Sequence, residues 1–288
     1  MTDEIFYKSP DGLSLYARCY GPLDAPLTAL CMHGLTRNHK DFEPMIEALG
    51  GRYRFIAVDQ RGRGKSDRDP VTEHYTPATY VGDMLALLNT LGLQRVALIG
   101  TSMGGLMSMI MMKAMPERVR GVVLNDVGPV FETRGLDRIA SYVGSVEPLS
   151  GWDAAAASVG RVQADVFPTY TAEDWMAFAR RTYRELDDGR VVLDYDPAIT
   201  QTVGQVRPGL LTRIAMWRLF KAMSAVPLLI IRGETSDILS EKTAQKMRRR
   251  HPDAKFVTVP RVGHAPILDE PEAVSAIGEF LHKLEPVS

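Results

Sequence analysis

The chain has 288 residues, enough for one or two domains with a sizeable hydrophobic core, so a small scaffold stapled by disulfides is excluded. Its 34 Lys and Arg balance 35 Asp and Glu, and a net charge of −1 argues against binding nucleic acid or an anionic membrane through overall charge. With 45% hydrophobic and 24% charged residues, the composition is that of a globular protein. Cys19 and Cys31 are too few for a disulfide framework, and a reducing compartment is the simplest expectation.

The chain begins with an acidic segment, whereas an export signal has a basic start followed by an apolar run, so we expect a cytoplasmic protein. The longest charge-free stretch, 96–112, is interrupted by glycines and is shorter than the roughly 18 to 20 apolar residues of a membrane span. We interpret it as a strand, a sharp turn and a buried helix, and we expect no membrane partner.

Short apolar runs rich in β-branched residues alternate with helical patterns, which is typical of a mostly parallel sheet covered by helices. Near the start, two extended runs flank the turn dipeptide Asp11-Gly12 and predict an antiparallel hairpin. The predicted strands are 4–8, 13–20, 27–32, 54–59, 96–99, 119–125, 227–232 and 255–259. The later runs are mostly continuously apolar, as expected of strands buried on both faces. The fold class is therefore α/β.

Helical spacing of apolar residues predicts a helix that follows Thr76 and ends at Gly92, and a last helix that begins near Pro271. The segment 128–226 breaks this rhythm, because it shows no strand series and contains all three tryptophans. It reads as several short helices, such as one over 172–184. We expect a helical cap inserted after the sixth strand, with 1–127 and 227–288 forming one α/β core.

The strongest local signal is Gly100-Thr101-Ser102-Met103-Gly104, which follows a predicted strand and precedes a predicted helix. A G-x-S-x-G pentapeptide in that context is a nucleophile elbow: a sharp turn exposes the serine hydroxyl above the sheet. The small residues on either side let strand and helix approach closely. The helix that follows directs its N-terminal N–H groups toward negative charge developing at the serine. Ser102 is therefore the predicted nucleophile.

A serine hydroxyl is a poor nucleophile unless a base takes its proton and a carboxylate orients that base. Among six histidines we select His264, which lies in a loop directly after the last predicted strand. For the carboxylate, Asp237 follows the preceding strand and gives the chain order Ser, Asp, His. Two alternatives stay open: Asp126, directly after the sixth strand, and Glu234, which lies closer to the seventh.

A tetrahedral intermediate also needs two hydrogen-bond donors directed at its oxyanion. We expect one to be the backbone N–H of Met103, directly after the nucleophile. The second is expected from the loop after the third strand, where Leu35 is the candidate and Gly34 lets the backbone turn inward. The pattern contains no metal site.

Taken together, these residues resemble the α/β-hydrolase family over essentially the whole chain. The resemblance is carried by His33-Gly34, the segment 59–66, the elbow at Ser102, Asp237 and the segment 262–264. It implies an eight-stranded, mostly parallel sheet, a helical cap between the sixth and seventh strands, and a serine hydrolase without a cofactor. Similar capped members include carboxylesterases, lactonases, C–C bond hydrolases and amide hydrolases.

The sequence differs from some members of the family at positions that determine the reaction, and these differences disfavour some reactions. Serine stands at the position that is aspartate in the family's haloalkane dehalogenases and epoxide hydrolases, and the loop after His33 lacks the Gly-Pro-Gly extension of many C–C hydrolases. The segment 59–66 ends like a phosphate-binding loop, but Asp59 stands where that loop needs glycine. We interpret it as a tight structural loop whose arginines hold neighbouring backbone or carboxylates.

The sequence thus predicts a serine hydrolase of a small carboxylic ester or lactone acting through an acyl-enzyme. The alternatives are a C–C bond or amide hydrolase of the same fold, or a ligand receptor with an idle triad. His33, Trp152 and Trp217 are the candidate substrate contacts. The expected partner is a small acyl substrate, with no nucleic acid, and a cap is a surface that often supplies an interface in a homo-oligomer.

Overall fold

The computed structural model describes residues 2–144, 147–205 and 209–286. Parts of the predicted domains, namely Met1, 145–146, 206–208 and 287–288, lie outside the described residues. Among the described residues, no helix is long and apolar enough to cross a membrane.

One eight-stranded sheet organises the molecule, in the order β1-β2-β4-β3-β5-β6-β9-β10. The pairs β1–β2 and β2–β4 are antiparallel and all others are parallel. Each strand coincides with a predicted run to within about two residues at either end, so the α/β fold class is confirmed. The strands are β1 (Thr2–Lys8), β2 (Ser14–Tyr20), β3 (Thr28–Met32), β4 (Arg54–Asp59), β5 (Val96–Thr101), β6 (Val119–Asn125), β9 (Leu228–Gly233) and β10 (Ala254–Val259).

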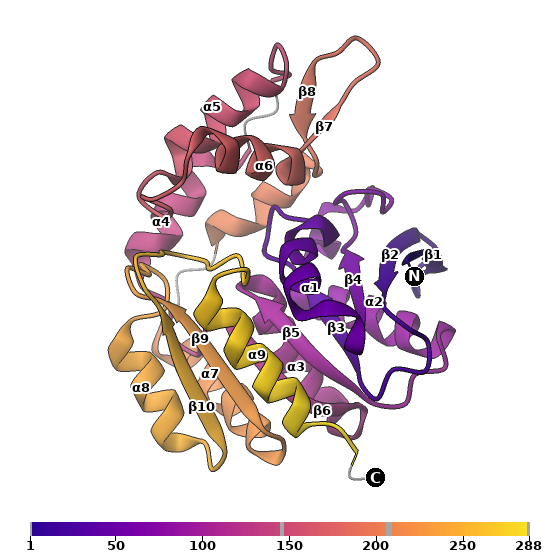
Figure 1. Ribbon diagram of the computed structural model, residues 1–288, viewed down its shortest axis with the longest axis vertical. Helices are drawn as coiled ribbons and strands as arrows, with labels where there is room; N and C mark the ends of the chain where they lie inside the picture. The colour runs from indigo at the N-terminus through magenta and orange to yellow at the C-terminus, as the bar shows by residue number, and fades with distance from the viewer. Residues whose placement is uncertain (1, 145–146, 206–208, 287–288) are drawn as a thin grey trace.

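Helices cover both faces of this sheet (Figure 1). On one face lie α1 (Glu43–Leu49) and α9 (Pro271–Lys283); on the other lie α2 (Pro77–Thr90), α3 (Met103–Ala114), α7 (Leu210–Ala222) and α8 (Glu241–Arg250). The predicted start of α2 is confirmed, since the Thr76 hydroxyl accepts a hydrogen bond from the Thr79 N–H. Pro271 is the first residue of α9, also as predicted.

The core consists of two apolar layers, one on each face of the sheet, because successive side chains of a strand point in opposite directions. On β3, Leu30 and Met32 contribute to the layer beneath α2 and α3, whereas Ala29 and Cys31 contribute to the layer beneath α1 and α9. All four are fully buried. Burial on both faces explains why these strands read as continuous apolar runs.

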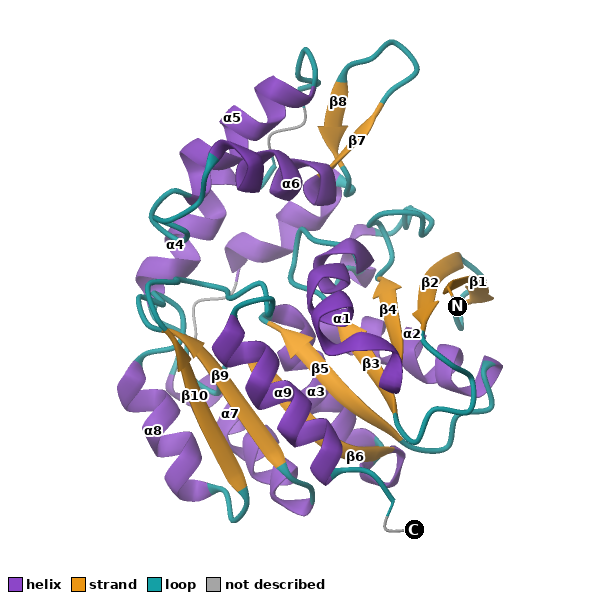
Figure 2. Cartoon of the chain, viewed as in Figure 1, coloured by secondary structure: helices purple, strands orange, loops and turns teal. Residues whose placement is uncertain are grey.

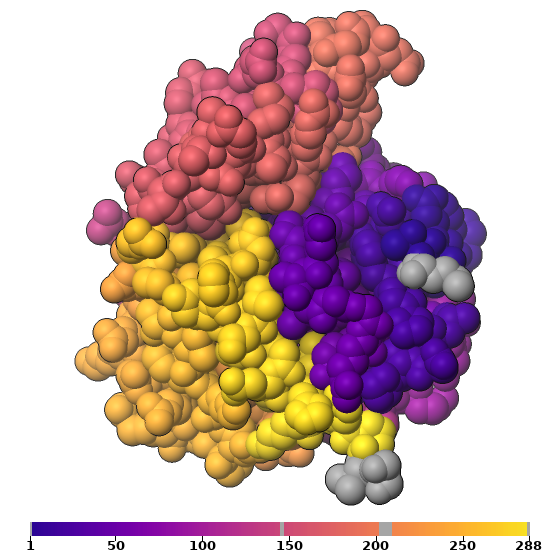
Figure 3. Space-filling view, viewed as in Figure 1, coloured from indigo at the N-terminus to yellow at the C-terminus, as the bar shows by residue number. Residues whose placement is uncertain are grey.

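A mostly helical lobe lies over the carboxyl ends of the parallel strands (Figure 2), and it projects from the rest of the molecular surface (Figure 3). It comprises α4 (Thr133–Tyr142), α5 (Trp152–Gln163), α6 (Ala172–Thr182) and a hairpin of β7 (Tyr183–Glu185) and β8 (Val191–Leu193). We call this lobe, 132–196, the cap.

Part of the predicted insertion 128–226 lies outside this lobe. Helix α7 lies within 128–226, but it packs against α3 on the face of the sheet. Its side chain Phe220 is buried in the same layer as the α3 methionines, so burial against the core places this helix there.

Candidate active site

Ser102 occupies the sharp turn between β5 and α3. Its backbone has φ 51° and ψ −110°, a conformation that a non-glycine residue adopts only when the surrounding structure enforces it. Helix α3 crosses close to β3 here: a Cβ added at Gly104 would overlap the carbonyl oxygen of Met32. At Gly100 a Cβ would overlap the backbone of Gly104. These two glycines therefore allow the tight strand–helix turn that raises the Ser102 hydroxyl above the sheet.

His264 lies beside this hydroxyl. It comes from the loop after β10, and its Nε2 is 2.9 Å from Ser102 Oγ. Its Nδ1 is 2.8 Å from Oδ2 of Asp126, which follows β6. Because a carboxylate accepts at Nδ1, that nitrogen carries the proton and Nε2 is left to accept from the serine hydroxyl. Three segments far apart in the sequence thus form one hydrogen-bonded chain.

Asp126 is completely buried and is held by further donors. The Gly233 N–H donates to Oδ1 at 3.1 Å, and the Ser236 hydroxyl donates to Oδ2 at 2.6 Å. Both donors come from β9 or the loop that follows it. Buried carboxylates need such partners, so the carboxylate is fixed in position toward His264.

The structure does not bring Asp237 to His264. Its carboxylate accepts two hydrogen bonds from Arg138 of α4, at 2.6 and 2.8 Å. Burial raises the pKa of the Asp237 carboxyl, but the Arg138 guanidinium outweighs this and leaves it below its ordinary value. The other alternative, Glu234, accepts from the Arg261 N–H at 2.7 Å. The preferred assignment of the carboxylate was therefore wrong in geometry, and the alternative Asp126 contacts the histidine.

The loop after β3 lies next to the nucleophile, as the oxyanion expectation requires. A Cβ added at Gly34 would be 3.9 Å from Cβ of Ser102, and Leu35 lines the same cavity as Ser102. Met103 is the first residue of α3, where a backbone N–H has no partner within the helix. Leu35 and Met103 thus remain the predicted donors to an oxyanion.

His33 is hydrogen-bonded to the backbone of this loop and does not line the cavity. It is fully buried; Nδ1 donates to the Gly34 carbonyl at 2.6 Å, and Nε2 accepts from the Gln60 N–H at 3.2 Å. Burial, together with the nearby charge of Arg63, lowers its pKa to about 4. His33 is therefore a neutral structural residue, and the expected substrate contact was wrong.

The two tryptophans proposed as substrate contacts also lie elsewhere. Trp152 donates from Nε1 to Glu185 at 3.0 Å and lies under the guanidinium of Arg180, on the cap. Trp217 belongs to α7 and packs edge-on against Phe220, with two cations of α8 over its ring. Neither lines the cavity, because each packs against its own neighbouring elements.

A cavity of about 450 Å³ opens above Ser102, between the cap and the strand ends. Its walls mix apolar side chains with hydroxyls, among them Phe178, Thr182 and Tyr183 of the cap. Arg37 is the only Lys or Arg among the described lining residues. Its guanidinium donates to both oxygens of Asp41 and stacks on Phe178 at 4.1 Å. The sequence analysis did not propose Arg37 as a site residue. Its position two residues after Leu35, in the loop expected to supply an oxyanion donor, could have indicated that it lies near the site.

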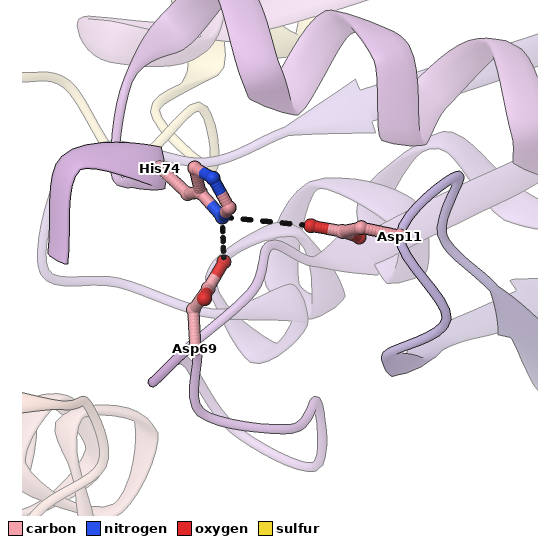
Figure 4. Close-up of side chains that lie close together, drawn as sticks. All are labelled: Asp11, Asp69 and His74. Atoms are coloured by element: carbon pink, nitrogen blue, oxygen red, sulfur yellow. Dashed lines mark hydrogen bonds and ion pairs between the residues drawn. The ribbon is translucent and has the colours of Figure 1, made fainter. Parts of the chain in front are cut away.

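One cluster of side chains has the composition of a metal site: Asp11, Asp69 and His74 (Figure 4). The His74 ring approaches both carboxylates, at 3.6 and 3.1 Å. The same carboxylates already pair with the Arg61 guanidinium, at 2.8 and 2.5 Å, and Arg61 also pairs with Asp83. A cation thus holds this cluster together, which is the structural role predicted for the loop 59–66.

Comparisons with known proteins agree with this geometry. A family model described as alpha/beta hydrolase family matches residues 29–277. The 3-hydroxybutyrate-oligomer hydrolase of Cupriavidus necator is 33% identical over 278 residues, covering 94% of either chain. The 2-(acetamidomethylene)succinate hydrolase of Mesorhizobium japonicum is 33% identical over 253 residues, covering 88% of this chain and 87% of that protein. A solved alpha/beta hydrolase from Novosphingobium aromaticivorans is 40% identical with a TM-score of 0.90, covering 98% of both chains.

Proposed function

Because the chain belongs to the alpha/beta hydrolase family, we propose that it is a serine hydrolase that cleaves a small carboxylic ester or lactone through an acyl-enzyme intermediate. The observation that supports this most directly is the hydrogen-bonded chain from Ser102 through His264 to Asp126. A buried carboxylate, an imidazole with a fixed tautomer and a strained serine are the parts that nucleophilic acyl transfer requires.

In the first half-reaction, Ser102 Oγ attacks the substrate carbonyl while Nε2 of His264 takes the hydroxyl proton. Asp126 stays ionised and stabilises the imidazolium that forms. The backbone N–H groups of Leu35 and Met103 donate to the carbonyl oxygen as it becomes negative. The imidazolium then gives its proton to the leaving alcohol, and the acyl group remains on Ser102.

In the second half-reaction, a water molecule takes the place of the alcohol. His264 accepts a proton from this water as it attacks the acyl carbonyl, and the collapse of the second tetrahedral intermediate releases the acid and restores the Ser102 hydroxyl. For a lactone, the alcohol and the acid belong to one product molecule. Apart from substrate and water, each step uses only residues of this chain.

The cavity favours a small substrate, and one relative favours an ester. A volume of about 450 Å³ matches a substrate of small-molecule size. A relative that is 33% identical is named as a hydrolase of 3-hydroxybutyrate oligomers, and a linear oligomer of a hydroxy acid is joined by ester bonds. Short hydroxy acid esters are therefore the first substrates to test.

An amide is the second candidate. A relative of equal identity is named 2-(acetamidomethylene)succinate hydrolase. The same residues would attack an amide carbonyl, with His264 giving its proton to the leaving nitrogen. Rates on matched esters, lactones and amides of one acyl group distinguish the two candidates.

Hydrolysis of p-nitrophenyl acetate and butyrate by wild type and Ser102→Ala tests the proposal. We expect Ser102→Ala to lower kcat by about 10⁴-fold or more. The matched control Ser240→Ala, at the start of α8, should retain wild-type turnover. Turnover by Ser102→Ala at the wild-type rate would contradict the proposed nucleophile.

A further inference from the structure

Arg63 is a buried arginine that forms no ion pair with a carboxylate among the described residues. It lies in the loop after β4 and is only 1% exposed. Its guanidinium donates to the backbone carbonyls of Leu35, at 2.9 Å, and Arg61, at 2.8 Å, and to the hydroxyl of Tyr80, at 2.9 Å. These acceptors are neutral, and no carboxylate of a described residue forms an ion pair with Arg63. Burying an unpaired charge costs several kcal/mol, so its presence requires an explanation.

The neighbouring buried charges show that Arg63 differs from the rest of its loop. Arg61, two residues earlier and equally buried, pairs with three carboxylates. Asp59 accepts from the ring and the N–H of His39 and from the Lys65 N–H. Three carboxylates thus balance the charge of Arg61. Among the described residues, the Arg63 guanidinium bonds to neutral acceptors instead.

Arg63 contacts both residues that are expected to bind the oxyanion. Its Nε–H holds the Leu35 carbonyl, and its Nη2 lies 3.8 Å from Sδ of Met103. Its charge also influences His33, the residue directly before Gly34. Burial is the main cause of the low pKa of His33, and the Arg63 charge is the second cause. The guanidinium therefore contacts both residues whose N–H groups are the expected oxyanion donors.

The backbone of Arg63 is anchored to the cap. Arg63 forms an isolated antiparallel bridge with Tyr195. The Gly64 N–H donates to the Asp194 carbonyl, and the Asp196 N–H donates to the Gly62 carbonyl. Tyr195 itself lines the cavity. Backbone bonds to the cap and side-chain bonds to the core thus hold the guanidinium rigidly.

We infer that Arg63 is a positioning residue of the oxyanion site, with two effects. Its bond to the Leu35 carbonyl fixes the peptide unit that follows Leu35, and so limits the movement of the residue whose N–H is the expected donor. Its uncompensated charge favours the negative oxygen that forms in the transition state, and this effect is large because the charge is buried. The inference rests on the proposed function, since it concerns the same acyl transfer.

The experiment compares Arg63→Met, Arg63→Gln and Arg63→Lys with wild type on p-nitrophenyl butyrate. Affinity for a trifluoromethyl ketone is measured in parallel, because such a ketone forms a tetrahedral alkoxide with the serine. We expect Arg63→Met to lower kcat about 10- to 100-fold with KM within about 3-fold, and to weaken the ketone by a similar factor.

The conservative variants separate charge from hydrogen bonding. Arg63→Lys keeps the charge and should retain more kcat than Arg63→Gln, which keeps only a donor. Arg118→Met is the matched control, because Arg118 also donates to backbone carbonyls, those of Leu93 and Gln94, and does not line the cavity. It should leave kcat and ketone affinity unchanged. Thermal unfolding of every variant identifies those that are folded.

The outcomes are distinguishable. If wild type neither hydrolyses the ester nor binds the ketone, the proposed function fails and the inference fails with it. If wild type is active and a folded Arg63→Met or Arg63→Gln keeps its kcat and ketone affinity, only the inference is overturned. If Arg63→Met does not fold, Arg63→Gln and Arg63→Lys decide: equal kcat values at the wild-type level overturn the inference.

Discussion

Asp126 and Asp237 are two carboxylates in the loops that follow neighbouring strands, and they have different partners. Asp126 directly follows β6 and has a positive φ of 55°. Its Oδ2 accepts a hydrogen bond from Nδ1 of His264. Asp237 lies further along the loop after β9, where the bidentate contact with Arg138 directs it toward the cap. The residue next to it, Ser236, donates to Asp126. The loop after β9 therefore supports the carboxylate without supplying it.

The structure brings together Ser102 and His264, two residues that the sequence proposed from local pattern: a glycine-flanked turn and a loop directly after a strand. The choice between Asp126 and Asp237 depends on the direction in which two loops leave adjacent strands. Neither loop has a sequence pattern that fixes this direction. The partner that draws Asp237 away, Arg138, lies 99 residues earlier in the chain.

Replacing each carboxylate by its amide tests the assignment. In Asp126→Asn the side chain no longer favours the proton on Nδ1 of His264, so we expect kcat to fall about 10³- to 10⁴-fold. Asp237→Asn, the matched control, should stay within about 3-fold of wild type because its carboxylate does not contact His264. Steady-state kinetics on p-nitrophenyl butyrate measure both. The opposite ranking would return the role to Asp237.

At the scale of elements, the strands of the large sheet were predictable from the sequence. Whether a given helix packs on the sheet or in the cap was less predictable. The central strands β3, β4, β5, β6 and β9 are mostly buried on both faces, and the sequence shows them as apolar runs. Helix α7 lies in the same stretch of the chain as the cap helices, and its packing against α3 shows that it covers the sheet. Position in the chain therefore does not show which of these helices packs on the sheet.

The turn between β5 and α3 makes a prediction about stability. By helix propensity alone, Gly104→Ala would stabilise α3 by about 1 kcal/mol. A Cβ there overlaps the Met32 carbonyl, so we expect a loss of about 3 kcal/mol or more, or no soluble protein. Gly82→Ala in α2 is the control: its Cβ would meet only Pro10, at 3.9 Å, and should stabilise by about 0.5 to 1 kcal/mol. Urea unfolding measures both; equal effects of the two changes would contradict this account of the turn.

At the scale of the whole molecule, the cap is tied to the core around the cavity. Arg138 reaches the loop after β9, and the Arg37 guanidinium and the Asn38 amide of the β3 loop contact the end of α6 at Thr182 and Arg181. Backbone hydrogen bonds between residues 194–196 of the cap and residues 62–64 of the core form a further link between the two. These links hold the cap over Ser102 and shield the reacting atoms from bulk water.

The loop that carries His264 makes stability depend on pH. Glu270 accepts the N–H groups of Ile267 and Leu268, and burial raises its pKa from 4.5 to about 7. The folded protein therefore binds this proton more tightly than the unfolded chain. Glu270 contributes most to stability below about pH 4.5, and its contribution falls as pH rises to about 7, by about 3 kcal/mol.

The difference between wild type and Glu270→Gln isolates this effect. Other groups titrate in the same range, including His33, whose pKa of about 4 makes stability fall as pH drops below its ordinary value, but they are common to both proteins. We expect Glu270→Gln to gain up to about 3 kcal/mol relative to wild type between pH 4.5 and 8, measured by urea unfolding. A difference that does not change with pH would show that Glu270 titrates normally.

The central claim is that Ser102, activated by His264 and Asp126, is the nucleophile of an alpha/beta hydrolase. Labelling with a fluorophosphonate, followed by peptide mass spectrometry, tests it most directly, because the reagent bonds only to an activated serine. We expect one adduct per chain, located on Ser102, and none in folded Ser102→Ala or His264→Ala. A folded wild-type protein that stays unlabelled, or that carries its adduct on another serine, would contradict the account.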